Sequence, residues 1–320
     1  MSGGVEIPVR VVAIEQATPT VKRFSLAARD GSPLPVFSAG AHVVVAMDAD
    51  DRRIKNPYSL IDRSADGSTY RIGVLRTPQS RGGSVFMHDR VAVGSELTIT
   101  MPVNLFPLNR TGRKHLLVAG GIGVTPIYAM AEELARQSVP YEIHYAMRDA
   151  AHGAFADELV ARHGDKVRLY RDDAREVIAV DRILPNQPLG THLYVCGPEG
   201  MINAILAGGR AAGWPEENLH AERFLAPPGG SPFALTLAKA GITTEVRGDQ
   251  SLLEAIEATG VDAPFLCRGG ACGQCETKVV SADGELVHND HFLSDEEKAS
   301  GAKIMTCVSR LQGRELVLDL

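Results

Sequence analysis

The pattern of hydrophobic and polar positions changes twice along this chain of 320 residues. In the first part, apolar and polar residues alternate over short stretches separated by glycine and proline, which is typical of strands that bury one face. One helix is predicted at residues 84–91, and the predicted strands are residues 9–14, 42–47, 70–75 and 96–101. We therefore expect a small antiparallel β-barrel over residues 1–111.

From about Lys114 onward, predicted strands alternate with predicted helices. The strands are residues 115–119, 141–147, 167–170 and 192–196, and the helices are residues 126–136, 155–162 and 199–212. This alternation indicates a doubly wound parallel sheet with helices on both faces. We assign residues 112–225 to this α/β domain.

Residues 226–232, with the sequence Ala-Pro-Pro-Gly-Gly-Ser-Pro, have the composition of a linker. Strands are predicted after it at residues 233–238 and 243–246. A helix follows at residues 252–259, where Ser251 and Glu254 have the spacing of a capping box. Residues 233–320 therefore form a third domain.

Composition and charge exclude several classes of protein. A hydrophobic content of 44% and a charged content of 22% are ordinary for a globular chain. A net charge of −6 argues against a general nucleic-acid binder, which needs clustered basic residues. The whole excess lies in residues 233–320, with 14 acidic and 8 basic residues. This acidic domain either improves solubility or attracts a basic partner surface.

No apolar run approaches the roughly 20 residues that span a bilayer, and residues 1–10 lack the pattern of a secretory signal. We therefore expect a cytoplasmic protein that does not bind membranes. No feature of the sequence indicates an obligate interface, so we also expect a monomer.

Four of the five cysteines, all except Cys196, lie in the last 54 residues and indicate a metal site. Cys267, Cys272 and Cys275, followed some 30 residues later by Cys307, have the plant-type spacing for a 2Fe–2S cluster. The small residues of the Arg-Gly-Gly-Ala-Cys-Gly segment leave room for backbone N–H groups to approach the cluster. The alternatives are zinc, which usually takes two cysteine pairs, and inert buried thiols.

Two glycine-containing turns indicate a nucleotide site. The segment Gly-Gly-Ile-Gly-Val-Thr-Pro at residues 120–126 follows a strand and begins a helix, where a pyrophosphate can approach the backbone. Cys196, Gly197 and Pro198 end a later strand of the same sheet. The spacing is not G-x-G-x-x-G, so a purely structural turn is the alternative. For Cys196 the alternative is a small buried hydrophobic residue.

Two further motifs complete a pattern: Asn-Pro-Tyr-Ser-Leu at residues 56–60, just after a predicted strand, and Arg-Gly-Gly-Ser at residues 81–84. With these motifs, the chain resembles the phthalate dioxygenase reductase family, the flavin reductases that supply Rieske oxygenases with electrons. The resemblance covers essentially the whole chain, including the closing strand at residues 315–320. It implies a flavin-binding β-barrel, an NAD domain and a C-terminal β-grasp ferredoxin domain.

The resemblance also implies residue roles. Flavin contacts are expected from Tyr58, Ser59, Gly73, Val74, Leu75, Arg81, Gly82, Gly83, Ser84 and Phe224. The nicotinamide nucleotide is expected to contact Gly121, Gly123, Thr125, Cys196, Gly197 and Pro198. Ser59 near flavin N5, Cys196, and Phe224 over the flavin face form the expected catalytic set.

One residue departs from the family pattern, because Asn56 stands where the family has an arginine that contacts the flavin phosphate. Arg52, Arg53, Lys55 and Arg81 are the candidates to replace this charge. Members with this domain order typically carry FMN, so FMN is predicted, with FAD as the alternative. Arg148 and Asp149 follow the second strand of the NAD domain, and the acidic residues Asp172 and Asp173 after the next strand favour NADH over NADPH.

NADH delivers two electrons at once, whereas a 2Fe–2S cluster accepts one, and a flavin connects the two. We therefore predict electron transfer from NADH to FMN, then to the cluster, then to a separate Rieske-type oxygenase that docks on the acidic domain. That oxygenase would hydroxylate aromatic rings or remove O- or N-methyl groups. The alternatives are a haem or diiron monooxygenase as acceptor and, more distantly, a non-enzymatic redox sensor.

Overall fold

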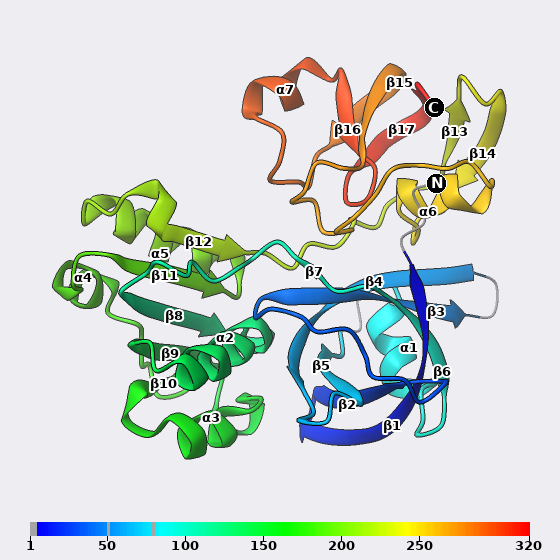
Figure 1. Cartoon of the computed structure of the whole chain (residues 1–320). Coiled ribbons are helices and arrows are strands. Elements are labelled where there is room, and N and C mark those ends of the chain that lie inside the picture. Colours follow the sequence, from blue (N-terminus) through cyan, green and yellow to red (C-terminus); the bar gives the residue numbers. More distant parts are fainter. Residues whose placement is uncertain (1–4, 50–51, 78–80) are drawn as a thin grey trace.

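The structure is a computed structural model that describes residues 5–49, 52–77 and 81–320. The chain forms a barrel, a parallel-sheet domain beside it and a C-terminal domain above the barrel (Figure 1). The fold class predicted from the sequence is confirmed. No helix in the described ranges is long and apolar enough to cross a membrane.

The barrel is an antiparallel sheet in the order β4-β5-β2-β1-β6-β3, which closes because β3 also pairs with β4. Its core contains Phe24, Leu26, Val43, Tyr70 and Ile72, all fully buried. The elements are β1 (Glu6–Thr18), β2 (Val21–Ala28), β3 (Ala41–Ala49), β4 (Arg52–Arg63), β5 (Thr69–Leu75), α1 (Gly83–Asp89), β6 (Glu96–Thr100) and the short β7 (Val103–Asn104), which pairs with β3.

The motif at residues 56–60 lies inside β4, which corrects the prediction that it follows a strand. Strand β4 was not predicted because three of its first four residues are basic and Pro57 interrupts the alternating pattern. Its register with β3, in which Ser59 is opposite His42, is decided by closure of the barrel.

The parallel sheet has the order β10-β9-β8-β11-β12. Its strands are β8 (Lys114–Gly120), β9 (Tyr141–Met147), β10 (Val167–Arg171), β11 (Thr191–Cys196) and β12 (Leu219–Glu222). Helices α2 (Val124–Gln137) and α3 (Ala156–His163) cover one face, and α4 (Val180–Ile183) and α5 (Glu199–Ala211) cover the other. Leu117 of β8 packs towards the first pair and Leu116 towards the second, so both faces are buried, as parallel sheets require.

The C-terminal domain is a mixed sheet in the order β14-β13-β17-β15-β16, with α6 packed in its core. Its elements are β13 (Phe233–Leu237), β14 (Ile242–Val246), α6 (Leu252–Ala258), β15 (Glu276–Val287), α7 (Asp295–Ser300), β16 (Lys303–Met305) and β17 (Arg310–Leu318). The capping box of α6 is present, since the Glu254 amide donates to Ser251 Oγ at 3.1 Å and the Ser251 amide donates to Glu254 Oε2 at 3.0 Å. Helix α7 was not predicted, although Ser294 and Glu297 form the same capping box.

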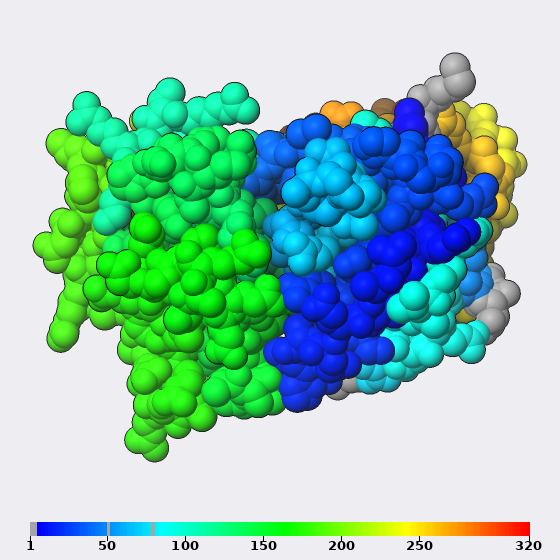
Figure 2. All heavy atoms as spheres, turned by 60° about the horizontal axis from the view of Figure 1, so that its bottom comes forward, coloured from blue at the N-terminus to red at the C-terminus, as the bar shows by residue number. Residues whose placement is uncertain are grey.

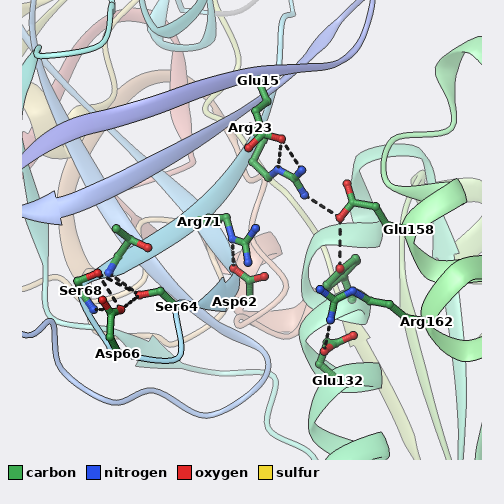
Figure 3. Close-up of polar contacts among 12 residues, drawn as sticks. Glu15, Arg23, Asp62, Ser64, Asp66, Ser68, Arg71, Glu132, Glu158 and Arg162 are labelled. Atoms are coloured by element: carbon green, nitrogen blue, oxygen red, sulfur yellow. Dashed lines mark hydrogen bonds and ion pairs between the residues drawn. The ribbon is translucent and has the colours of Figure 1, made fainter.

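The barrel and the parallel-sheet domain pack against each other along one side of the molecule (Figure 2). At this contact the guanidinium of Arg23 on β2 lies between Glu15 and Glu158, the second of which belongs to α3 (Figure 3). Arg23 Nη1 is 2.8 Å from Glu158 Oε2, and Tyr128 donates a hydrogen bond to the same oxygen at 3.3 Å. The two domains are thus joined by a shared polar contact.

Candidate functional site

Three predicted cluster cysteines lie on the loop before β15, and Cys307 approaches them from the connection between β16 and β17. Cys275 Sγ and Cys307 Sγ are 3.1 Å apart, and the Gly269 amide donates to Cys267 Sγ at 3.3 Å. Hydrogen bonds from neighbouring thiols and from the Gly269 and Ala271 amides lower the pKa of Cys267. Cys272 is the half-exposed member, and the other three are buried. A set of close thiols with inward N–H groups fits a 2Fe–2S cluster.

A cavity of about 450 Å³ lies where the three domains meet, within the size range of small-molecule sites. It brings together predicted residues from each domain. These lining residues are Asn56, Tyr58, Ser59, Gly73, Leu75, Arg81, Ser84, Thr125, Phe224 and Cys267. The predicted flavin, nicotinamide and cluster residues therefore share one space.

The barrel wall of this cavity is built on β4 and β5. Ser59 is buried, and burial raises the pKa of Tyr58 to about 12, so its hydroxyl stays protonated at neutral pH. Gly73 allows the other wall to approach, because a Cβ there would lie 2.9 Å from Thr125 Cγ2. Phe224 is 49% exposed at the end of β12 and faces the cavity.

The residues predicted to bind the flavin phosphate, Arg81 and Ser84, contact other protein groups in this structure. The guanidinium of Arg81 forms an ion pair with Glu254 of the C-terminal domain and lies 3.4 Å from Asn56 Oδ1. Ser84 Oγ accepts a hydrogen bond from the Thr77 amide at 3.1 Å. Gly82 has a φ of 99°, a backbone conformation that favours glycine. A Cβ at Gly83 would collide with the Asn56 amide, so Gly83 allows the close approach of α1 to β4.

The two glycine turns lie side by side at the switch point of the parallel sheet, because β8 and β11 are neighbours. A Cβ at Gly123 would collide with the Cys196 carbonyl, and one at Gly197 would lie 2.9 Å from Gly120 Cα. These glycines therefore allow the two turns to pack. Gly121, with a φ of 53°, faces open space and leaves room for a ligand.

Several predicted residues do not line the cavity. The Val74 side chain is fully buried in the barrel core, and its carbonyl accepts a hydrogen bond from His88 Nε2 at 2.8 Å. Cys196 is 1% exposed, and burial raises the pKa of its thiol. Arg148 is exposed, and the Asp149 carboxylate caps the turn after β9 by accepting from the His152 amide at 3.0 Å.

The cavity also contains residues that the sequence reasoning missed, including His42, Glu222 and Arg268. Among the described residues, His42 Nε2 and Glu222 Oε2 are buried and have no hydrogen-bond partner. Burial raises the pKa of Glu222 to about 8 and lowers the pKa of His42. Glu222 is opposite Cys196 in the ladder of β11 and β12, but β12 is too short to be predicted. Orphaned polar atoms in a cavity wall fit a site that receives a polar cofactor.

Two family models match the chain. Residues 101–219 match the dimethylamine monooxygenase subunit DmmA-like, N-terminal domain, and residues 235–312 match the 2Fe-2S iron-sulfur cluster binding domain. The carnitine monooxygenase reductase subunit of Acinetobacter baumannii is 44% identical over 315 residues, which are 98% of each chain. The heme-dependent oxidative N-demethylase beta subunit of Ectopseudomonas mendocina is 43% identical over 98% of this chain and 99% of the relative.

Two solved structures also match this chain over nearly its whole length. The structure of phthalate dioxygenase reductase matches with a TM-score of 0.89 and 32% identity over 98% of both chains. An intact type IV self-sufficient cytochrome P450 monooxygenase matches with a TM-score of 0.72 and 36% identity over 99% of this chain, but over 41% of that longer chain.

The barrel, the parallel sheet and the thiol loop around a shared cavity define an electron-transfer reductase with a 2Fe–2S domain. The full-length matches identify it further. The chain belongs to the phthalate dioxygenase reductase-like family, together with reductase subunits of monooxygenase and demethylase systems. The resemblance inferred from the motifs is confirmed.

Proposed function

We propose that this reductase passes electrons from NADH through FMN and the 2Fe–2S cluster to a separate Rieske-type oxygenase in a ring-hydroxylating or demethylating system. The observation that carries the proposal is the shared cavity, in which Ser59, Thr125 and Cys267 come from three different domains. A bound flavin supplies the chemistry that accepts a hydride and releases single electrons. A flavin in this cavity would lie beside both the predicted nicotinamide residues and the cluster loop.

The residues of this chain orient the cofactors and exclude water. Tyr58 and Ser59 would hold the flavin from the barrel, and Phe224, which lines the same cavity, would cover a face of its ring. The pKa of Glu222, about 8, keeps this side chain protonated at neutral pH, so that it is a hydrogen-bond donor beside Cys196. A neutral donor binds the uncharged carboxamide of nicotinamide without placing a charge next to the reacting atoms.

FMN is proposed because family members with this domain order typically carry it, and NADH because of the charge at the end of β9. Arg81 lies 3.4 Å from Asn56, where the family motif has its arginine, and pairs with Glu254, so a flavin phosphate would share this cation with that carboxylate. At the end of β9, a hydrogen bond from His152 lowers the pKa of Asp149 and keeps this carboxylate ionised. A carboxylate there repels a ribose 2′-phosphate and therefore favours NADH.

A haem monooxygenase or demethylase is the second candidate acceptor, because a relative 43% identical over nearly its whole length is a heme-dependent oxidative N-demethylase beta subunit. The electron path inside this chain is the same for either acceptor. In both cases we expect the acidic C-terminal domain, with the half-exposed Cys272, to receive the partner and the chain to act as a monomer.

The test is the visible spectrum of the purified protein before and after anaerobic NADH, with the released flavin identified by mass. We expect flavin and cluster bands to bleach and FMN to be released. Release of FAD would show that the flavin is FAD rather than FMN. A protein that NADH leaves unchanged after cofactor reconstitution would refute the proposal. Reconstitution with Rieske-type and haem-dependent oxygenases then decides between the two acceptors.

A further inference from the structure

One carboxylate joins the flavin-binding strand to the cluster-binding loop. Glu257 on α6 places Oε1 3.0 Å from Lys55 Nζ of the barrel, and the same oxygen forms an ion pair with Arg268. Lys55 directly precedes the flavin motif at residues 56–60, and Arg268 directly follows the first cluster ligand, Cys267. Glu257 therefore bridges two points that are each one residue from a cofactor site.

The two cations that Glu257 bridges lie in a poorly solvated environment. The side chains of Arg268 and Lys55 are 4% and 17% exposed, so neither cation is well solvated. Both lie over the ring of Phe265, Arg268 at 4.0 Å and Lys55 at 5.5 Å from its centroid. Because a buried cation without its partner is strongly unfavourable, Glu257 is required for the two cations to be held together.

The barrel and the C-terminal domain are not packed tightly against each other beside this bridge. A crevice of about 420 Å³ lies between the barrel and the C-terminal domain, and Lys55, Glu257, Phe265 and Arg268 form part of its wall. The backbone of Arg268 is also in the left-handed region, with a φ of 51°, which a non-glycine residue rarely adopts. The Arg268 side-chain contacts thus compensate for an unfavourable backbone in the cluster loop.

We propose that Glu257 is a positioning residue for internal electron transfer, which holds the cluster loop against the flavin strand through Lys55 and Arg268. This inference rests on the proposed function. It assigns to Glu257 no contact with either cofactor. Its role is to set how close the two sites lie.

The test uses the full-length reductase with its cofactors and follows the anaerobic reaction with NADH by stopped-flow absorbance. The variants are Glu257→Gln, Lys55→Met, the double variant and the conservative Lys55→Arg. Arg71→Met is the matched control, because Arg71 is a partly buried cation that pairs with Asp62 within the barrel. Flavin bleaching reports hydride transfer, and cluster bleaching reports the internal step.

We expect Glu257→Gln to slow cluster reduction about fivefold or more, with hydride transfer within about twofold of the wild type, and Lys55→Met to slow cluster reduction to the same extent. The double variant should be no slower than the slower single variant, because both changes remove the same contact. Lys55→Arg, which keeps the cation, and the control Arg71→Met should react like the wild type. Hydrogen exchange, a readout independent of turnover, should become faster at residues 266–275 in Glu257→Gln and stay unchanged in the parallel-sheet domain.

Three results would overturn the inference: an unchanged internal step in Glu257→Gln, additive effects in the double variant, or equal losses of both phases. Failure of the proposed function is distinguishable, because in that case the cluster of the wild-type protein itself would not be reduced after the flavin.

Discussion

Replacement of Gly73 by alanine tests whether the barrel and the NAD domain must approach closely for hydride transfer. The new methyl carbon would lie 2.9 Å from Thr125 Cγ2, whereas ordinary contacts begin at 3.4 Å. One wall of the cavity must therefore move by about 0.5 Å, an overpacking strain of about 1–3 kcal/mol. Since a displacement of about 1 Å can cost about 100-fold in rate, we expect hydride transfer to slow about tenfold.

The assay is stopped-flow reduction of the bound flavin by NADH, with the flavin content of each preparation measured separately. Thr125→Ser supplies the matched rescue, because it removes the methyl group that collides and keeps the hydroxyl that donates to the Ile122 carbonyl at 3.0 Å. The double variant should recover at least half of the lost rate on a logarithmic scale. A Gly73→Ala protein within twofold of the wild type, or a double variant no faster than Gly73→Ala, would refute the reasoning.

Three further predictions concern the cavity and the cluster. Glu222→Gln should remove a pH-dependent fall in hydride transfer centred near pH 8, the pKa to which burial raises Glu222; a wild-type profile that is flat from pH 6 to 9.5 would contradict this. The unfolded chain ionises Glu222 near pH 4.5, so its contribution to folding stability is full below that pH and lost as the pH rises through 8, and thermal unfolding at pH 6 and 9 in both proteins checks the sign. Cys272→Ser should abolish reduction of the natural partner and spare NADH–ferricyanide activity, and joint loss of both would make the cluster structural for the whole chain. Phe224→Ala should change hydride transfer or nicotinamide binding while the cluster absorbance stays intact, and an unchanged flavin reduction rate would disprove the role of this ring.

Local patterns predicted the parts of the site whose chemistry is contained in a short segment. The spacing of Cys267, Cys272 and Cys275 predicts the cluster loop, because three ligands from one loop must follow each other closely. The turn at residues 120–126 was recognisable for a similar reason, since a strand, a glycine turn and a helix are adjacent in sequence. The roles of Gly123 and Gly197 were not recognisable from the sequence, because these glycines allow one turn to pack on another.

Residues whose importance depends on a distant neighbour gave no such signal. His42 looks like one polar position in an apolar strand until the barrel closes and places it opposite Ser59. Arg81 matched a phosphate motif, but docking of the C-terminal domain pairs it with Glu254, 173 positions later. Strand β12 was not predicted because four residues carry too little periodicity. The burial of Glu222, its last residue, was therefore not predicted either.

The sequence by itself predicted the three-part organisation, the 2Fe–2S domain and the family, all of which are confirmed, and the cluster ligands, which stay a prediction. Hydrophobic periodicity and ligand spacing are local properties that each segment expresses before it meets another. Only the tertiary structure decided which residues share the cavity, which carboxylates neutralise Arg81 and Lys55, and which polar atoms are left buried without partners. These outcomes depend on how the three domains dock, and docking joins residues about 200 positions apart, such as Lys55 and Glu257, through contacts for which no short segment carries a pattern.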